Sequence, residues 1–428
     1  MDNNLDNRLN KGKRQKIVVA IGLALLVVVS FLGGYFLNYI INGKKINKVT
    51  SVLRIMESVG FIMDENGEPR EITEEELADA LVNAVLDDYS AYYTAEEYEE
   101  TKQRGKGNLT GVGLTFYDAD CIVDKIVGNS PADNSGIMAG DELLSGEING
   151  KTEQFDKYLD MITFLENVPS EVDLKINAKR NGEKLEFSLK KVKYVASYVT
   201  YYDNEVKFCF KTENNDKLTA KSYNGLGKTE LNSDTAYISF DSFEGDADKE
   251  LIQALEFMKE RGRTKLILDL RGNGGGYMDV LTEVAGCLIH CNGKNNFIVA
   301  VAESKNNKER FYSGKNRFNT EIKSIAVLAD KRSASASECL IGAMIHYGGA
   351  FSRDKLIIEK AGDQKATTYG KGIMQTTYGL IGGGALKLTT ARILWPDEQT
   401  CIHGKGIETK AENQVAKEKV LSRALQVL

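Results

Sequence analysis

Predicted strands and helices alternate between residues 235 and 347, and this order constrains the fold more than any other feature of the sequence. Apolar runs at Thr235 to Phe240 and Thr264 to Leu270 are typical of strands, and the second is of the fully buried type that parallel sheets favour. An amphipathic helix from Asp246 to Arg261 separates them. The series continues with a helix at Met278 to Leu288, strands at Phe297 to Ala302 and Ser324 to Ala329, and a helix at Ala336 to Tyr347. This order predicts an α/β fold with a mostly parallel sheet covered by helices.

An uncharged apolar stretch from Ile17 to Leu37 sets the N-terminus apart from the rest of the chain. Its length is about the 20 residues that cross a bilayer as a helix. Five basic residues precede it and favour a cytoplasmic N-terminus: Arg8, Lys11, Lys13, Arg14 and Lys16. A cleaved signal peptide is the alternative, but no clear A-x-A site ends the stretch. We therefore expect a cytoplasmic tail at 1–16, a single transmembrane anchor in the cell membrane at 17–41, and the remaining residues outside the cytoplasm.

The composition is that of a globular protein and argues against some classes of function. At 428 residues the chain is long enough for two or three domains. Its net charge is −6, and no basic block occurs outside the N-terminus, which argues against nucleic-acid binding. The six cysteines form no C-x-x-C pair, so we predict no metal site. Buried free thiols are the favoured interpretation of these cysteines, and disulfides are the alternative.

Residues 45–107 are predicted to form an N-terminal helical region. Thr73 and Glu76 make a capping box at the start of a helix that we expect to run to Asp87. The segment from Asp88 to Tyr93 is predicted as a turn, and an acidic helix from Thr94 to Lys102 follows it. The charge run in that helix is typical of a solvated face.

Residues 108–194 are predicted to form a separate module. Gly111-Val112-Gly113-Leu114 is a glycine-flanked turn that leads into a strand, and Ser130-Pro131-Ala132 opens a short helix. An amphipathic helix at Phe155 to Glu166 and a hairpin turn at Asn181-Gly182 follow. This layout, with the string S-P-A-x-x-x-G-I-x-x-G-D-x-L, resembles a PDZ domain. In such domains the first turn donates backbone N–H groups to a peptide's terminal carboxylate, which implies that role for Gly111, Val112, Gly113 and Leu114. A turn without a ligand is the alternative.

A glycine-rich segment from Asp269 to Gly276 lies between a predicted strand and a predicted helix. A phosphate site is one interpretation of such a place. The segment matches neither G-x-G-x-x-G nor G-x-x-x-x-G-K-[ST], however. Successive glycines instead let backbone N–H groups approach a substrate closely. A developing oxyanion needs donors of that kind.

Two short segments carry residues for nucleophilic chemistry, Ser333 to Glu338 and Gly370 to Gln375. A serine needs a base, and the chain has only three histidines, none in a recognisable motif, so a lysine is the more natural base. Lys371 has an apolar, glycine-flanked context, and burial there would lower its pKa toward the range of general bases. Gln375 lies four residues on and is expected on the same face, where it can hydrogen-bond the amine. The alternatives are a helix cap for Ser335, a surface lysine and an ordinary strand glutamine.

Together these segments resemble the C-terminal processing (tail-specific) serine peptidases, which use a Ser–Lys dyad. The resemblance extends over much of the chain and includes Asp88 to Tyr92, Tyr237 to Phe240, Leu268 to Gly276, Ala385 to Arg392 and Ile402 to Glu408. It implies that Ser335 is the nucleophile, Lys371 the base and Gln375 the partner that orients the base. It also implies an oxyanion hole made by the N–H groups of Gly276 and Ala336. The implied fold is a ClpP/crotonase-like peptidase domain at 195–428, with the PDZ domain inserted before it.

Two features depart from the pattern of that family. Ser335 and Lys371 are 36 residues apart, which is a longer interval than expected. The excess is expected between Tyr347 and Thr368. An extra loop there, beside the dyad, could gate access or hold the dyad misaligned, and the sequence leaves this open. Cys339 is the second departure, because a cysteine is unusual so close to a nucleophile.

The sequence thus predicts a membrane-anchored, extracytoplasmic serine endopeptidase that cuts proteins near their C-termini and requires no metal or cofactor. Its expected partners are protein or peptide substrates, bound by their C-termini, and the membrane, but not nucleic acid. A homo-oligomer is left open. One alternative is a catalytically inactive scaffold that binds peptides through the PDZ module. The other is a crotonase-like enzyme that acts on acyl thioesters.

Overall fold

The computed structural model describes residues 51–52, 55–56, 68 and 70–428, with gaps at 118, 214–216, 224–230, 292–295, 316, 319–320, 361 and 363–364. The predicted cytoplasmic tail and anchor at 1–41 lie outside the described residues. Within the described part of the chain, no helix combines the length and the apolar character that a bilayer crossing requires. The chain divides into two compact units between Ala80 and Leu81.

Helix α2 (Glu74–Val85) begins at the predicted capping box and ends two residues earlier than expected. The N–H of Thr73 donates to the Glu76 carboxylate at 2.9 Å, and the N–H of Glu76 donates to the Thr73 hydroxyl at 3.1 Å. These two bonds satisfy N–H groups that a helix start otherwise leaves without partners. Helix α3 (Ala95–Gly105) also begins with a capping box, between Thr94 and Glu97.

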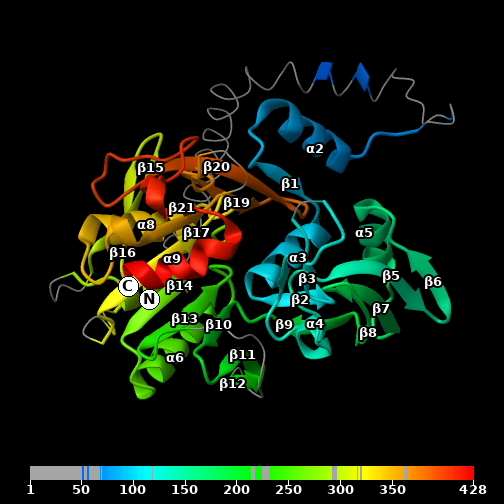
Figure 1. Cartoon of the computed structure of the whole chain (residues 1–428). Helices are drawn as coiled ribbons and strands as arrows, with labels where there is room; N and C mark the ends of the chain where they lie inside the picture. The colour runs from blue at the N-terminus through cyan, green and yellow to red at the C-terminus, as the bar shows by residue number, and fades with distance from the viewer. Residues whose placement is uncertain are drawn as a thin grey trace, which may run out of the picture. The chain divides into compact units, whose positions relative to one another are not determined.

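The unit that starts at Leu81 is built around an eight-stranded sheet with the strand order β12-β11-β10-β13-β14-β17-β18-β21 (Figure 1). The strands from β13 to β21 run parallel, as predicted, and β10 to β12 extend the sheet antiparallel. The parallel strands are β13 (Thr235–Phe240), β14 (Lys265–Asp269), β17 (Ser324–Ala329), β18 (Leu356–Glu359) and β21 (Gln414–Val415). The antiparallel strands are β10 (Val199–Tyr202), β11 (Lys207–Glu213) and β12 (Lys217–Tyr223).

Helices cover both faces of this sheet, because alternate strand residues point to opposite faces. Leu266 and Leu268 of β14 share one core with α6 (Ala247–Glu260), α7 (Met278–Leu288) and α8 (Ala336–Tyr347). Ile267, between them, belongs to a core on the other face with α9 (Val420–Val427). The parallel, helix-covered α/β sheet predicted from the sequence is therefore confirmed.

A second, antiparallel sheet packs against the helical core and was not predicted. Its strand order is β1-β20-β15-β16, and β19 pairs with β20. The strands are β1 (Ala91–Tyr93), β15 (Ile298–Ser304), β16 (Lys308–Tyr312), β19 (Ile373–Gly379) and β20 (Ala385–Leu394). Two predictions were wrong here. The apolar strand near residue 298 was placed in the parallel series, and residues 91–93 were assigned to a turn. Val299, Ala300 and Val301 are all buried, so this antiparallel strand has the continuous apolar pattern typical of parallel ones.

The predicted extra loop between Tyr347 and Thr368 includes two short elements of regular structure. It contains the short 3₁₀ helix η1 (Arg353–Lys355) and the strand β18, which pairs in parallel with β17. Part of the long interval between Ser335 and Lys371 is therefore a strand of the main sheet. The other described residues of this segment lie outside helices and strands, as expected of a loop, and its effect on the site stays a prediction. The chain ends with the 3₁₀ helices η2 (Ala411–Asn413) and η3 (Lys417–Lys419) before α9.

The small module, residues 108–195, has a core of its own around Leu143, Met161 and Leu174. It contains a four-stranded sheet of order β6-β5-β7-β8 and two two-stranded pairs, β2-β9 and β3-β4. Asn181 and Gly182 both have positive φ, at 51° and 89°, as the predicted two-residue hairpin requires. Its elements are β2 (Asn108–Gly111), β3 (Leu114–Thr115), β4 (Lys125–Ile126), α4 (Pro131–Ser135), β5 (Glu142–Ile148), β6 (Lys151–Gln154), α5 (Tyr158–Asn167), β7 (Asp173–Arg180), β8 (Glu183–Lys190) and β9 (Val192–Val195).

Candidate active site

Ser335 stands immediately before α8 in a strained backbone conformation. Its φ is 56° and its ψ is −114°, a region that residues other than glycine rarely adopt. Such strain costs about 1–3 kcal/mol and is concentrated at functional sites. The glycine-rich turn passes close by, because a Cβ added at Gly275 would lie 2.7 Å from the Ser335 Cβ. Only a residue without a side chain fits there.

The Ser335 hydroxyl donates to no described residue, whereas the hydroxyls of the neighbouring serines do donate. Ser333 Oγ donates to the carbonyl of Leu270 at 2.7 Å, and Ser337 Oγ donates to the carbonyl of Asn273 at 3.0 Å. Ser335 and Glu338 form a capping box at the start of α8, and the Ser335 hydroxyl donates to no described residue. Of the three serines in the segment, Ser335 alone is available to react.

Glu338 joins the segment of Ser335 to the segment of Lys371. Its carboxylate accepts the N–H groups of Ser335 at 3.0 Å, Lys371 at 2.8 Å and Gly370 at 2.8 Å. It also accepts the Thr368 hydroxyl at 2.5 Å. Burial raises the pKa of Glu338 above its usual range, although these donors oppose the shift. One buried carboxylate thus holds the backbone of Ser335 close to the backbone of Lys371, although the two residues are 36 positions apart in the sequence. The sequence had indicated Glu338 only as part of a helix cap.

Lys371 lies half-buried just before β19, and its amine has no hydrogen bond or ion pair to any residue that the structure describes. Burial lowers the pKa of Lys371 below the lysine value of 10.5, and the charge of Lys387 acts in the same direction. Asp87 acts against them. The environment therefore favours the neutral amine, which is the form that can accept a proton.

Two backbone N–H groups beside Ser335 lack acceptors among the described residues, those of Gly276 and Ala336. Their neighbours are bonded: the N–H of Gly275 donates to Asn273 Oδ1 at 2.9 Å, and that of Tyr277 donates to the carbonyl of Phe243 at 2.8 Å. Ala336 is the first residue of α8, where the helix dipole favours negative charge. Both groups were predicted as oxyanion donors, and both are free to serve.

One cavity of about 690 Å³ brings these groups together. It is lined by Ser335, Lys371, Gln375 and the glycine turn through Gly276. The rest of its wall mixes apolar and polar side chains: Met278, Phe311, Cys339, Ile373, Met374, Ile393, Ser242, Tyr277, Glu244 and Glu309.

Gln375 differs from what the sequence predicted, whereas Cys339 is a buried free thiol as expected. Gln375 Nε2 donates to Thr389 Oγ1 at 3.1 Å, and no hydrogen bond joins Gln375 to the Lys371 amine in the described structure. Burial raises the pKa of Cys339 to about 12, so its thiol is neutral and a poor nucleophile.

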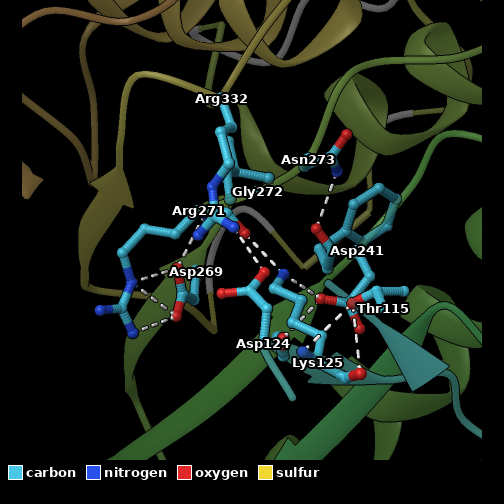
Figure 2. Close-up of polar contacts among 12 residues, drawn as sticks. Thr115, Asp124, Lys125, Asp241, Asp269, Arg271, Gly272, Asn273 and Arg332 are labelled. Atoms are coloured by element: carbon cyan, nitrogen blue, oxygen red, sulfur yellow. Dashed lines mark hydrogen bonds and ion pairs between the residues drawn. The ribbon is translucent and has the colours of Figure 1, made fainter. Parts of the chain in front are cut away.

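A network of ion pairs and hydrogen bonds holds the glycine-rich turn in place (Figure 2). Arg271 pairs with Asp269 at 2.6 Å and with Glu359 at 2.7 Å, and the N–H of Gly272 donates to Asp330 at 2.9 Å. Burial opposes ionisation of Asp269, but the charge of Arg271 outweighs it and lowers the pKa of Asp269. The turn that carries Gly276 is thereby anchored to β14, β17 and β18.

Side chains of the small module enter the same network. Lys125 Nζ donates to Asp241 at 2.6 Å and to the carbonyl of Arg271 at 2.5 Å, and Asp124 pairs with Arg332. Figure 2 shows Lys125 reaching from the module toward Asp241 and the turn. No sequence motif indicated these contacts, because they join residues more than a hundred positions apart.

The predicted peptide-binding turn lies between β2 and β3 of the module. Val112 is buried, and its carbonyl accepts the N–H of Ala132 at 2.9 Å. Gly113 has a φ of 84°, and a Cβ there would lie 2.1 Å from the Ser130 Cβ. Gly111 ends β2 and Leu114 begins β3. The turn therefore has the glycine-dependent geometry expected of it, and its binding role stays a prediction.

Comparison with known proteins assigns the class. Residues 234–412 match the model of Peptidase family S41. A CtpA-like serine protease of Staphylococcus aureus (strain bovine RF122 / ET3-1) is 26% identical over 422 residues, which cover 95% of this chain and 75% of the relative. A CtpA-like serine protease of Staphylococcus epidermidis (strain ATCC 12228 / FDA PCI 1200) is 26% identical over 331 residues, which cover 77% of this chain and 58% of the relative. A solved photosystem II D1 C-terminal processing protease is similar over 83% of this chain and 85% of that chain, with 18% identity and a TM-score of 0.48.

The chain is therefore a serine peptidase. Its residues 234–412 match peptidase family S41, and the chain is similar to CtpA-like serine proteases, in line with the resemblance of its motifs to the C-terminal processing peptidases.

Proposed function

We propose that this chain is a membrane-anchored endopeptidase that acts outside the cytoplasm and cuts proteins near their C-termini. The observation that carries the catalytic part is the cavity shared by Ser335, Lys371 and Gly276, with Ala336 next to Ser335 at the start of α8. The uncharged stretch at 17–37 supports the anchor.

The proposed reaction uses Lys371 as the base and Ser335 as the nucleophile. The neutral amine of Lys371 takes the hydroxyl proton as Ser335 Oγ forms a bond to the substrate carbonyl carbon. The carbonyl oxygen becomes an oxyanion, and the N–H groups of Gly276 and Ala336 stabilise it. The peptide C–N bond then breaks, and the leaving amine takes the proton from Lys371. A water molecule, deprotonated by Lys371, releases the acyl group and restores Ser335.

The small module is proposed to be a PDZ domain that binds the substrate's C-terminus. Its turn from Gly111 to Leu114 would donate N–H groups to the terminal carboxylate, and the substrate would add as a strand beside β3. The glycine geometry of the turn supports this role. The alternative of an inactive scaffold is disfavoured, because Ser335, Lys371 and the oxyanion donor Gly276 line one cavity.

Binding of two matched peptides tests the recognition step. Both peptides have the same apolar C-terminal residue, but one ends in a free carboxylate and the other in an amide. The full chain carrying Ser335→Ala is expected to bind the carboxylate peptide at least about tenfold more tightly, because a charged acceptor strengthens hydrogen bonds. Fluorescence anisotropy measures both affinities without cleavage. Equal affinities would contradict recognition of the carboxylate and would leave the catalytic assignment untouched.

A further inference from the structure

The turn from Asp87 to Ser90, just before β1, lies beside the proposed base although it is far from it in the sequence. Strand β1 pairs antiparallel with β20, with Ala91 opposite Lys387 and Tyr93 opposite Ala385. Strand β20 in turn pairs with β19, which follows Lys371. The pairing of these three strands brings the turn to the end of the sheet where Lys371 lies.

Tyr89, in this turn, presents its ring to the amine of Lys371. Lys371 Nζ lies 5.1 Å from the ring centroid, which is within the range of a cation–π contact. The ring is itself held in place, because its hydroxyl donates to the Tyr369 hydroxyl at 3.4 Å and its edge packs on His403. The hydrogen bond with Tyr369, together with burial, raises the pKa of Tyr89 to about 12. The group that faces Lys371 is therefore a neutral phenol.

The same turn also holds the strand that carries Gln375 in place. Asp87 Oδ1 accepts the Ser90 hydroxyl at 2.8 Å, and Ser90 Oγ accepts the N–H of Thr389 at 3.2 Å. Thr389 Oγ1 accepts Gln375 Nε2 at 3.1 Å. Hydrogen bonds through Ser90 and Thr389 thus connect the turn to Gln375 in the cavity wall. The turn therefore contacts the Lys371 amine through the ring of Tyr89 and also supports the strand that follows Lys371.

We propose that Tyr89 is a positioning residue of the dyad, whose ring holds the Lys371 amine in place through a cation–π contact. The inference rests on the proposed function, because it assigns Tyr89 a role toward the base. A neutral ring attracts the ammonium form more than the neutral amine, so Tyr89 opposes the effect of burial. Other groups also face Lys371 or its segment, and their charges must be kept constant in any test: Asp87, Lys387, Tyr369, Glu338, Cys339 and His403.

The pH dependence of kcat/KM of the full chain tests this role. Loss of the ring in Tyr89→Leu favours the neutral amine, so the acidic limb of the profile is expected to move to lower pH by about half a unit or more. The plateau rate is expected to fall roughly tenfold, because the amine is then less well placed. Tyr89→Phe keeps the ring and should keep the acidic limb of the wild-type protein.

Tyr93→Leu is the matched control. Tyr93 lies in β1, and its ring faces another lysine, with Lys387 Nζ 5.7 Å from the centroid. This variant removes a similar contact from the strand that follows the turn, and its acidic limb should stay in place. An acidic limb of Tyr89→Leu that coincides with that of Tyr93→Leu overturns the proposal.

Fluorinated phenylalanines at position 89 keep the test decisive even where the leucine variant does not fold. They preserve the shape of the ring and weaken its attraction for a cation step by step. A graded shift of the acidic limb to lower pH supports the proposal, and an unshifted limb across the series overturns it. Failure of the proposed function gives a different result, because Lys371→Ala would then retain wild-type activity.

Discussion

Replacement of Ser335 by alanine is expected to reduce kcat for peptide hydrolysis by on the order of 10⁴-fold or more. The reason is that no other described serine at the site has a free hydroxyl: those of Ser333 and Ser337 donate to backbone carbonyls. The neutral thiol of Cys339 is a poor substitute. Hydrolysis of a fluorogenic peptide, with the variant purified free of wild-type protein, measures the effect.

Ser337→Ala is the matched control for this experiment. It removes a neighbouring hydroxyl whose hydrogen bond to the carbonyl of Asn273 is structural. A lost hydrogen bond of this kind costs about 1 kcal/mol of stability. We expect this variant to have a lower melting temperature than the wild-type protein and to retain most of the peptidase activity. Activity that survives Ser335→Ala but is lost in Ser337→Ala would show that the nucleophile has been misassigned.

Gly276→Ala is expected to lower kcat by about 10²-fold to 10³-fold, the usual effect of losing one oxyanion donor. Gly276 has a φ of 148°, and a Cβ there would lie 2.3 Å from the carbonyl oxygen of Phe243. The backbone must move to relieve that contact, and its N–H then leaves the position beside Ser335. The measurement is kcat and KM on one peptide, with circular dichroism to show that the variant is folded.

Gly274→Ala serves as the control, because a Cβ at Gly274 would meet no atom within 4 Å. It changes the same turn by the same methyl group without a steric conflict. A far smaller loss of activity is expected for it. Equal losses in the two variants would indicate that the turn tolerates no side chain at all, and the oxyanion role of Gly276 would have no support.

Much of the main sheet could be predicted from the sequence, because its signals are local. Strands β13 and β17 and helices α7 and α8 begin and end at the predicted residues. Their apolar patterns and flanking turns are complete within each segment. The antiparallel sheet was missed for the opposite reason. Strand β1 spans only Ala91–Tyr93, and what makes it a strand is its pairing with β20, almost three hundred residues later.

The candidate site shows the same division between local and distant signals. Ser335, Lys371, Gly276 and Ala336 stand in recognisable segments, and the structure brings them to one place. The contacts that position them were not predictable, since Glu338 reaches Gly370 and Lys371 across more than thirty residues. The predicted partner of the amine, Gln375, bonds to Thr389 instead, because pairing with β20 places that hydroxyl next to it.

Chemical rescue of Lys371→Ala by a small amine tests the assignment of the Ser–Lys dyad most directly. In the wild-type chain, kcat/KM should rise with pH as Lys371 loses its proton, with a midpoint below the ordinary lysine value of 10.5. Lys371→Ala should be as inactive as Ser335→Ala. Added methylamine should restore part of the activity in proportion to its unprotonated form. Wild-type activity of Lys371→Ala without any amine would contradict the assignment.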